Sequence, residues 1–126
     1  MPFEAVRDAA LRAEIAVVAS SREGFGRVAV EAFAAGNALV STRFGGLAEV
    51  IDDCALSLER GDPAEIARAL DLLIRDPELR ADLARRDQAR FRSHFTIDTF
   101  ANALDDAIAS LRRQASVGAT SLENPQ

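Results

Sequence analysis

Apolar residues in the first half of the chain gather in short runs, and amphipathic stretches separate these runs. Residues 15–19 form a β-branched apolar run, which is typical of a parallel strand buried on both faces. Residues 3–13 repeat apolar positions at helical spacing, with Phe3, Val6 and Ala10 on one face. The pattern predicts this order of elements: helix 3–13, strand 15–19, helix 28–35, strand 38–42, helix 47–52 and strand 55–58.

The rest of the chain reads as helices that begin at recognisable caps. Asp62, Asp76 and Thr96 are capping residues, and proline follows the two aspartates at the first helical position. Beyond residue 114 the composition becomes polar, so we expect a disordered tail over residues 115–126. Arginines that alternate with acids indicate a solvated helical face. These arginines are Arg75, Arg80, Arg85, Arg86, Arg90 and Arg92.

This order of elements predicts an α/β fold. We expect a partial Rossmann-like, three-layer parallel sheet of about three strands, with right-handed crossovers and a helical C-terminal extension. We assign residues 1–114 to one domain. In such sheets ligands bind at the carboxyl ends of the strands, which directs attention to the loop after the first strand.

A single acidic residue interrupts the helix that follows this loop. Residues 28–35 are apolar on every side except at Glu31. A helix that is apolar all round is buried, and a buried carboxylate without a partner is costly. We therefore expect Glu31 to be buried and to meet a hydrogen-bond donor. The residues leave two sources of that donor open: a ligand, or an arginine such as Arg27 or Arg43.

A loop with two glycines, Glu23-Gly24-Phe25-Gly26, leads directly into this helix. Glycines let bare backbone amides approach a ligand, and the positive end of a helix favours anions such as phosphates. The carboxylates of Glu23 and Glu31 can both accept hydrogen bonds from hydroxyl groups. A ligand with a phosphate in its middle and hydroxyls at both ends would satisfy all of these groups at once.

These residues resemble the E-x7-E donor-binding motif of the retaining GT-B glycosyltransferases of the large group-4 family. Glu23 and Glu31 correspond to the two glutamates, and the resemblance is collinear over residues 10–110. It implies a glycosyltransferase that binds a nucleotide-diphosphate sugar and transfers the sugar with retention to an unknown acceptor. Three further motifs carry the resemblance: Ala32–Gly36, Leu39–Thr42 and Gly45–Val50.

The resemblance also implies a role for each residue of the motif. Glu31 would bind the ribose hydroxyls, since a vicinal diol gives two donors to one carboxylate. Glu23 would be the catalytic residue and hold sugar hydroxyls near the anomeric centre; the alternative is a loop glutamate in water. Gly45 and Gly46 would border the donor pocket or form a helix-entry turn. The other donor-binding residues would act through backbone amides: Gly24, Phe25, Gly26, Arg27 and Val28.

Charge and composition exclude several other classes. The net charge of −5 argues against binding of nucleic-acid backbones. All 15 basic residues are arginine, so no lysine can contact a phosphate. Cys54 is the single cysteine, so we expect no disulfide, no metal site and no cofactor besides the donor substrate. No apolar run approaches the length of a membrane span, and the first residues lack a signal-peptide pattern, so we expect a cytoplasmic protein.

Three strands are few for a Rossmann-like sheet, and no part of the chain resembles the N-terminal acceptor domain of the family. We therefore expect a fragment, the last part of a donor-binding domain. Its open sheet edge would pair with a missing N-terminal half or with another chain. Two functions stay open: a piece of a glycosyltransferase, and a catalytically inactive fragment that binds nucleotide weakly or acts as an interaction module.

Overall fold

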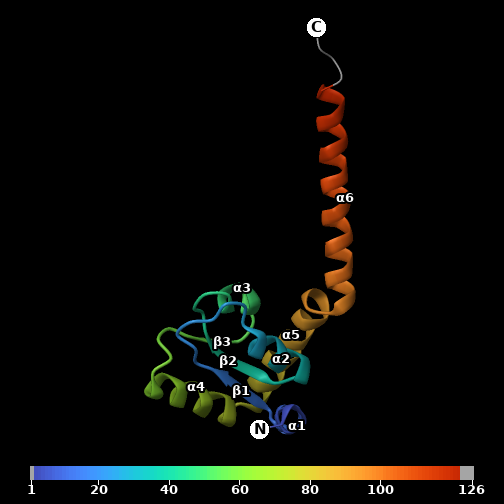
Figure 1. The fold of residues 1–126 in the computed structure, drawn as a ribbon. Coiled ribbons are helices and arrows are strands. Elements are labelled where there is room, and N and C mark those ends of the chain that lie inside the picture. The colour runs from blue at the N-terminus through green and yellow to red at the C-terminus, as the bar shows by residue number, and fades with distance from the viewer. Residues whose placement is uncertain (1, 123–126) are drawn as a thin grey trace. The chain divides into compact units, whose positions relative to one another are not determined.

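The structure is a computed structural model that describes residues 2–122, with side chains through residue 117. The chain forms two units, which divide between Ser93 and His94. The elements follow the predicted order (Figure 1). They are α1 (Phe3–Arg12), β1 (Ile15–Val18), α2 (Arg27–Ala35), β2 (Ala38–Thr42), α3 (Leu47–Ile51), β3 (Leu56–Leu58), α4 (Pro63–Arg75), α5 (Pro77–His94) and α6 (Ile97–Leu122).

The first unit contains a parallel sheet in the order β1-β2-β3. Val17 of β1 pairs with Val40 of β2, and Val40 pairs with Leu56 of β3. The predicted α/β class with three parallel strands is therefore confirmed. Within residues 2–122, β1 pairs with β2 alone, so its other side is a free sheet edge.

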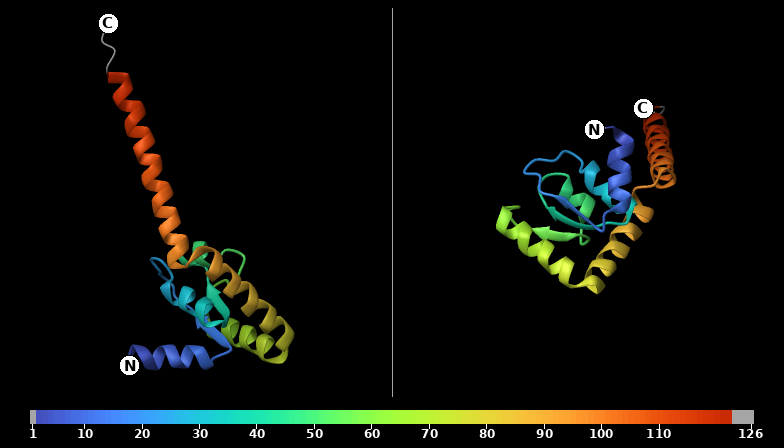
Figure 2. Two further views of the ribbon diagram at one scale, coloured as in Figure 1. Left: turned by 90° about the vertical axis from the view of Figure 1, so that its right-hand side faces the viewer. Right: turned by 90° about the horizontal axis from the view of Figure 1, so that it is seen from below.

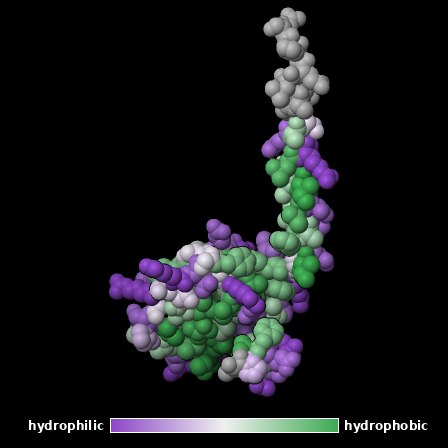
Figure 3. All heavy atoms as spheres, in the orientation of Figure 1, coloured by the Kyte–Doolittle hydropathy of each residue, from purple (hydrophilic) through white to green (hydrophobic). Residues whose placement is uncertain are grey.

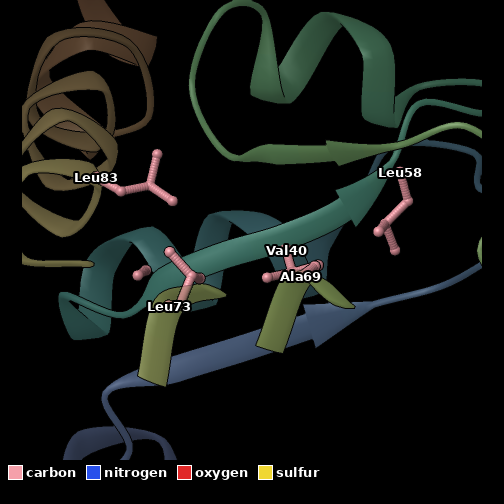
Figure 4. Packing of buried hydrophobic residues seen from close by; sticks show 6 residues of the cluster. Val40, Leu58, Ala69, Leu73 and Leu83 are labelled. Carbon is pink, nitrogen blue, oxygen red and sulfur yellow. The ribbon is translucent and has the colours of Figure 1, made fainter. Parts of the chain in front are cut away.

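Helices cover both faces of this sheet. Val40 packs in one cluster with Ala69 and Leu73 of α4 and Leu83 of α5 (Figure 4). Neighbouring strand residues point to opposite faces, so the buried Leu39 points to the other side, where α2 and α3 contact β2. Figures 1 and 2 show α2 and α4 on opposite sides of the strands. This arrangement is the three-layer architecture that the sequence predicts.

Two of the arginines predicted to be solvated are instead mostly covered. The side chain of Arg80 is 21% exposed, and its Nη1 donates to the carbonyl oxygen of Leu73 at 2.7 Å. The side chain of Arg90 is 15% exposed and binds carbonyl oxygens of α3. The last carbonyls of a helix lack intrahelical donors and carry partial negative charge, which favours a cation there. Charge alternation along α5 could not reveal these tertiary contacts.

The second unit contains α6, which begins after Thr96. The cap predicted there is present, because the Thr99 amide donates to Thr96 Oγ1 at 3.2 Å. The helix continues to Leu122, although the sequence predicts disorder from residue 115. Residues 115–117 are Ala, Ser and Val, none of which breaks a helix, so polar composition alone was a poor stop signal. Residues 123–126 of the predicted tail lie outside the described residues, and the predicted domain 1–114 spans both units.

Candidate functional site

The loop between β1 and α2 places Glu23 next to the first turn of α2. Gly26 is the residue before α2, and its φ of +85° lies in the left-handed region that favours glycine. Oε1 of Glu23 accepts a hydrogen bond from the Gly26 amide at 3.4 Å. A Cβ at position 26 would also lie only 3.0 Å from Cδ2 of Leu47. Backbone conformation therefore favours glycine at position 26, and a side chain there would also press on Leu47.

Gly45 and Gly46, the two residues before α3, contact this loop. The Gly46 amide donates to the carbonyl oxygen of Glu23 at 2.9 Å. A Cβ at Gly45 would lie 2.3 Å from the Glu23 carbonyl oxygen, and one at Gly46 would lie 2.2 Å from the Gly24 carbonyl oxygen. Both positions exclude any side chain because backbone packs on backbone. Gly45 and Gly46 thus form a helix-entry turn that holds the candidate loop.

Gly24 differs from these glycines. Its φ is not left-handed, and a Cβ built on it would meet no atom within 4 Å. The fold of the described residues therefore has no need of glycine at this position. Glycine without a conformational or packing reason is expected where a ligand approaches the backbone closely.

Helix α5 fixes α3 and, through it, the glycine turn. Nε of Arg90 donates to the Val50 carbonyl oxygen at 2.6 Å, and Nη2 donates to the Glu49 carbonyl oxygen at 2.7 Å. Its Nη1 also lies 3.6 Å from Oδ2 of Asp52, at the end of α3. One side chain thus satisfies the C-terminal carbonyls of a five-residue helix. The contacts run without a break from α5 through α3 to the loop at Glu23.

Glu31 lies on the open face of α2 and not in the core. Its side chain is 47% exposed, and Oε1 accepts a hydrogen bond from Nε of Arg27 at 2.9 Å. The prediction that α2 is buried on every side is wrong, because burial is confined to one stripe that includes Ala32 and Phe33, whereas Val28 is 56% exposed. Of the two donor sources that the sequence leaves open, the structure contains the arginine. The donor-binding role of Glu31 stays a prediction.

Two clefts reach Glu31, and both open between α1 and α2. Their volumes are about 250 and 300 Å³, and apolar residues such as Val6 and Ala10 line both of them. Neither cleft is lined by Glu23 or by the glycines next to it. Of the two glutamates, Glu31 therefore lies beside these clefts, whereas Glu23 lines neither of them. The catalytic role of Glu23 likewise stays a prediction.

Among the described residues, the buried acid is Asp87 of α5, which the sequence analysis missed. Its two carboxylate oxygens accept hydrogen bonds from the amides of Leu39 and Ala55, each at 3.0 Å. Burial raises the pKa of Asp87 above its ordinary value, although these two amide bonds act in the opposite direction. One available signal was its spacing, since Asp87 follows the buried Leu83 by four residues and so shares its helix face.

The described residues give little support to metal binding, to a reactive thiol or to a membrane-spanning helix. Residues 2–122 contain no group of three histidine, cysteine or acidic side chains arranged to hold a metal ion. Cys54 is buried, and burial together with Asp87 raises the pKa of its thiol. None of the helices described has the length and apolar character that a membrane span needs.

A comparison with known protein families identifies the family of this chain. The model of the family "Glycosyl transferases group 1" matches residues 1–90. The chain belongs to this family. Among curated relatives, a D-inositol 3-phosphate glycosyltransferase of Acidothermus cellulolyticus is 37% identical over 108 residues, which are 82% of this chain and 24% of the relative. A glycogen synthase of Mycobacterium tuberculosis is 36% identical over 104 residues, 81% of this chain and 25% of the relative.

Solved structures of similar proteins share the fold. HepE of Anabaena in complex with UDP superposes with a TM-score of 0.74 at 25% identity and covers 81% of this chain and 29% of its own. The C-terminal domain of LpcC, a group 1 family protein of Francisella tularensis, gives 0.61 at 35% identity, with 67% of this chain and 44% of that one covered. This group 1 chain thus spans about a quarter of the length of the curated relatives that it matches.

Proposed function

We propose that this chain is part of a glycosyltransferase and that residues 23–31 bind a nucleotide-diphosphate sugar. Membership of the group 1 family supports sugar transfer. The similar HepE protein has been crystallised with UDP and with UDP-glucose, which supports this class of donor. Four finer parts of the proposal rest on the sequence alone. They are membership of the group-4 subdivision, the GT-B architecture of a whole enzyme, transfer with retention and a cytoplasmic location. The acceptor stays unknown.

The observation that supports the proposal is that the backbone near Gly24 has room for a ligand. No side chain caps α2, so the amides of Arg27 and Val28 in its first turn are open to an anionic ligand. Gly24 lies just before them with open space where a side chain would stand. A phosphate oxygen at this helix end would bind amides that no side chain caps. Glu23, whose Oε1 accepts a hydrogen bond from the Gly26 amide at 3.4 Å, would bind a sugar hydroxyl through its other carboxylate oxygen.

Ligand binding at Glu31 requires its ion pair with Arg27 to open. Both side chains are largely exposed, and exposed pairs four residues apart on a helix contribute about 0.3–0.5 kcal/mol. Two hydrogen bonds from a ribose diol to the carboxylate outweigh that cost, because charge-assisted bonds contribute about 1.5–3 kcal/mol each. The ion pair is therefore compatible with the proposed role.

Titration of the 15N-labelled protein with UDP, followed by amide chemical shifts, tests the proposal. Gly24→Ala should leave the melting temperature unchanged and weaken UDP binding, because the fold has room for a methyl group that the ligand would meet. Glu31→Gln should weaken binding about tenfold or more, as expected for a lost charge-assisted hydrogen bond. Glu78→Gln, which changes an exposed acid of α5, is the matched control. Equal affinities in all four proteins would remove residues 23–31 from the site, and absence of UDP binding by the wild-type chain would refute donor binding by this chain alone.

A second candidate, an inactive interaction module, rests on the free edge of β1. In the described residues one side of the β1 backbone has no partner strand, and Val17 on this strand is exposed. Such an edge favours pairing with another strand. Binding of a strand-forming partner without any UDP binding would favour this candidate over the first.

A further inference from the structure

The loop between β1 and α2 lacks apolar side chains that could anchor its first half. Residues 20–24 are Ser, Ser, Arg, Glu and Gly, so this part of the loop has no apolar side chain to bury. Figure 3 shows mostly pale or hydrophilic side chains at the upper left of the first unit, where the loop runs in Figure 1. The position of the loop therefore depends on hydrogen bonds from the rest of the unit.

Two hydrogen bonds from β2 and the turn after it hold this loop. Thr42, the last residue of β2, donates from Oγ1 to the carbonyl oxygen of Ser20 at 2.7 Å. The Gly46 amide donates to the carbonyl oxygen of Glu23 at 2.9 Å. The first bond comes from a side chain and the second from the backbone, so a substitution can remove the first and keep the second.

Packing directs the Thr42 hydroxyl to Ser20. The Thr42 side chain is fully buried. A Cβ built on Gly61 would lie 2.7 Å from Cγ2 of Thr42, so the methyl group of Thr42 fills the space beside this glycine. Since both branches of the side chain start at Cβ, the packed methyl group also fixes the direction of the hydroxyl. A fully buried side chain cannot touch a ligand at the loop, so any effect of Thr42 on binding passes through the loop.

We propose that Thr42 is a positioning residue for the sugar-binding part of the donor site. This inference rests on the proposed function, in which Glu23 and Gly24 meet the sugar whereas α2 meets the phosphate and the ribose. The bond to Ser20 fixes the start of the loop, and the bond from Gly46 fixes its middle. Together these two bonds set where the Glu23 carboxylate stands relative to α2.

Thr42→Val probes this role because valine has nearly the same shape and lacks the hydroxyl. A methyl carbon stays about 3.3 Å or more from a carbonyl oxygen, whereas Oγ1 of Thr42 lies 2.7 Å from that of Ser20. The start of the loop must therefore move by about half an ångström. Loss of a hydrogen bond that orients a ligand-binding residue typically weakens binding about tenfold, so we expect a loss of this size at the sugar.

Titration of the 15N-labelled chain with UDP-glucose and with UDP measures the effect. Thr42→Val should weaken UDP-glucose binding about tenfold and UDP binding by less than about threefold, because α2 keeps its place. Thr42→Ser keeps the hydroxyl and should restore the wild-type ratio of the two affinities. Ser41→Ala is the matched control, since Ser41 is equally buried in β2 but donates to the Thr42 carbonyl oxygen and not to the loop. An unchanged ratio in Thr42→Val, or failure of Thr42→Ser to restore it, would overturn the inference.

Amide hydrogen exchange of the ligand-free proteins distinguishes a failure of this inference from a failure of the proposed function. In Thr42→Val the Gly46 amide should exchange about tenfold faster relative to the buried Leu39 amide, which serves as the reference for global unfolding. Exchange at Gly46 that does not change relative to Leu39 would overturn the inference, whether or not the nucleotides bind. Binding of neither nucleotide by the wild-type chain would refute the proposed function and with it the role of Thr42 at the sugar, whereas faster exchange at Gly46 would still show that Thr42 holds the loop.

Discussion

Replacing Asp87 with alanine removes the acceptor of two backbone amides at once. One belongs to Leu39 at the start of β2 and the other to Ala55 just before β3. Ala55 has a φ of +67°, which residues other than glycine rarely adopt. The carboxylate therefore joins α5 to two strands and also holds an unfavourable turn in place.

The expected loss follows from the burial of these groups. A buried amide that loses its acceptor costs about 1–3 kcal/mol. The Leu39 amide is fully buried, whereas the Ala55 amide is only partly buried and can be reached by water. The substitution also removes the cost of burying a carboxylate, and this offsets part of the loss of stability. We expect Asp87→Ala to lower the free energy of unfolding by about 2–4 kcal/mol and Asp87→Asn, which keeps one acceptor, by about half as much.

Urea denaturation followed by circular dichroism at pH 7 measures these losses. The free energy of unfolding of each variant is compared with the wild type at equal slope. A loss below about 0.5 kcal/mol for Asp87→Ala would fall within the range of ordinary surface substitutions and refute the reasoning. A larger loss for Asp87→Asn than for Asp87→Ala would refute it as well.

The same residue predicts a pH dependence. Burial raises the pKa of Asp87 above 3.8 in the folded protein, so the folded state keeps this proton at pH values where the unfolded chain has lost it. The stability linked to the protonated form is present below the unfolded pKa and is lost as the pH rises through the folded pKa. The stability advantage of wild type over Asp87→Ala should therefore be larger at pH 4 than at pH 7. An advantage that grows toward pH 7 would contradict this sign.

Three further substitutions test the supports of the loop. Gly46→Ala should destabilise the protein by about 2 kcal/mol or more in thermal unfolding, because its methyl group would lie 2.2 Å from the carbonyl oxygen of Gly24. Arg90→Gln removes two hydrogen bonds to α3 and should cost about 1.5–3 kcal/mol in urea denaturation, whereas Arg92→Gln, the exposed control on the same helix, should cost little. Arg27→Ala should change stability by less than about 0.5 kcal/mol, since its ion pair is exposed; a larger loss would show that the pair is structural.

Local patterns were enough to predict the elements of the fold. The strands are short apolar runs, and each helix begins or ends at a residue with a clear conformational preference. Gly36 ends α2 with a φ of +77°, and Asp62 caps α4 by accepting a hydrogen bond from the Glu65 amide at 2.8 Å. These signals act between near neighbours in the chain, so the sequence contains them directly.

The candidate site was harder to predict because its parts meet through the fold. The apolar surroundings of Glu31 suggested burial, but burial depends on what packs over α2, and only one face of this helix is covered. Asp87 and Arg90 lie on a helix whose charges alternate, and their partners are 32 to 48 residues away. Sequence periodicity does not indicate such distant pairs. The roles predicted for Glu23 and Glu31 rest on family resemblance and await the ligand titration.

The hydrogen bond that joins the two glycine turns is made by main-chain atoms, the Gly46 amide and the Glu23 carbonyl oxygen. Every amino acid shares these atoms, so this bond does not depend on which side chains the outward positions of the loop carry. Phe25 and Phe44, one in each turn, both point to solvent. Mutation could therefore replace such outward residues and alter what the loop recognises while its architecture persists, whereas any substitution of Gly45 or Gly46 would deform the architecture itself.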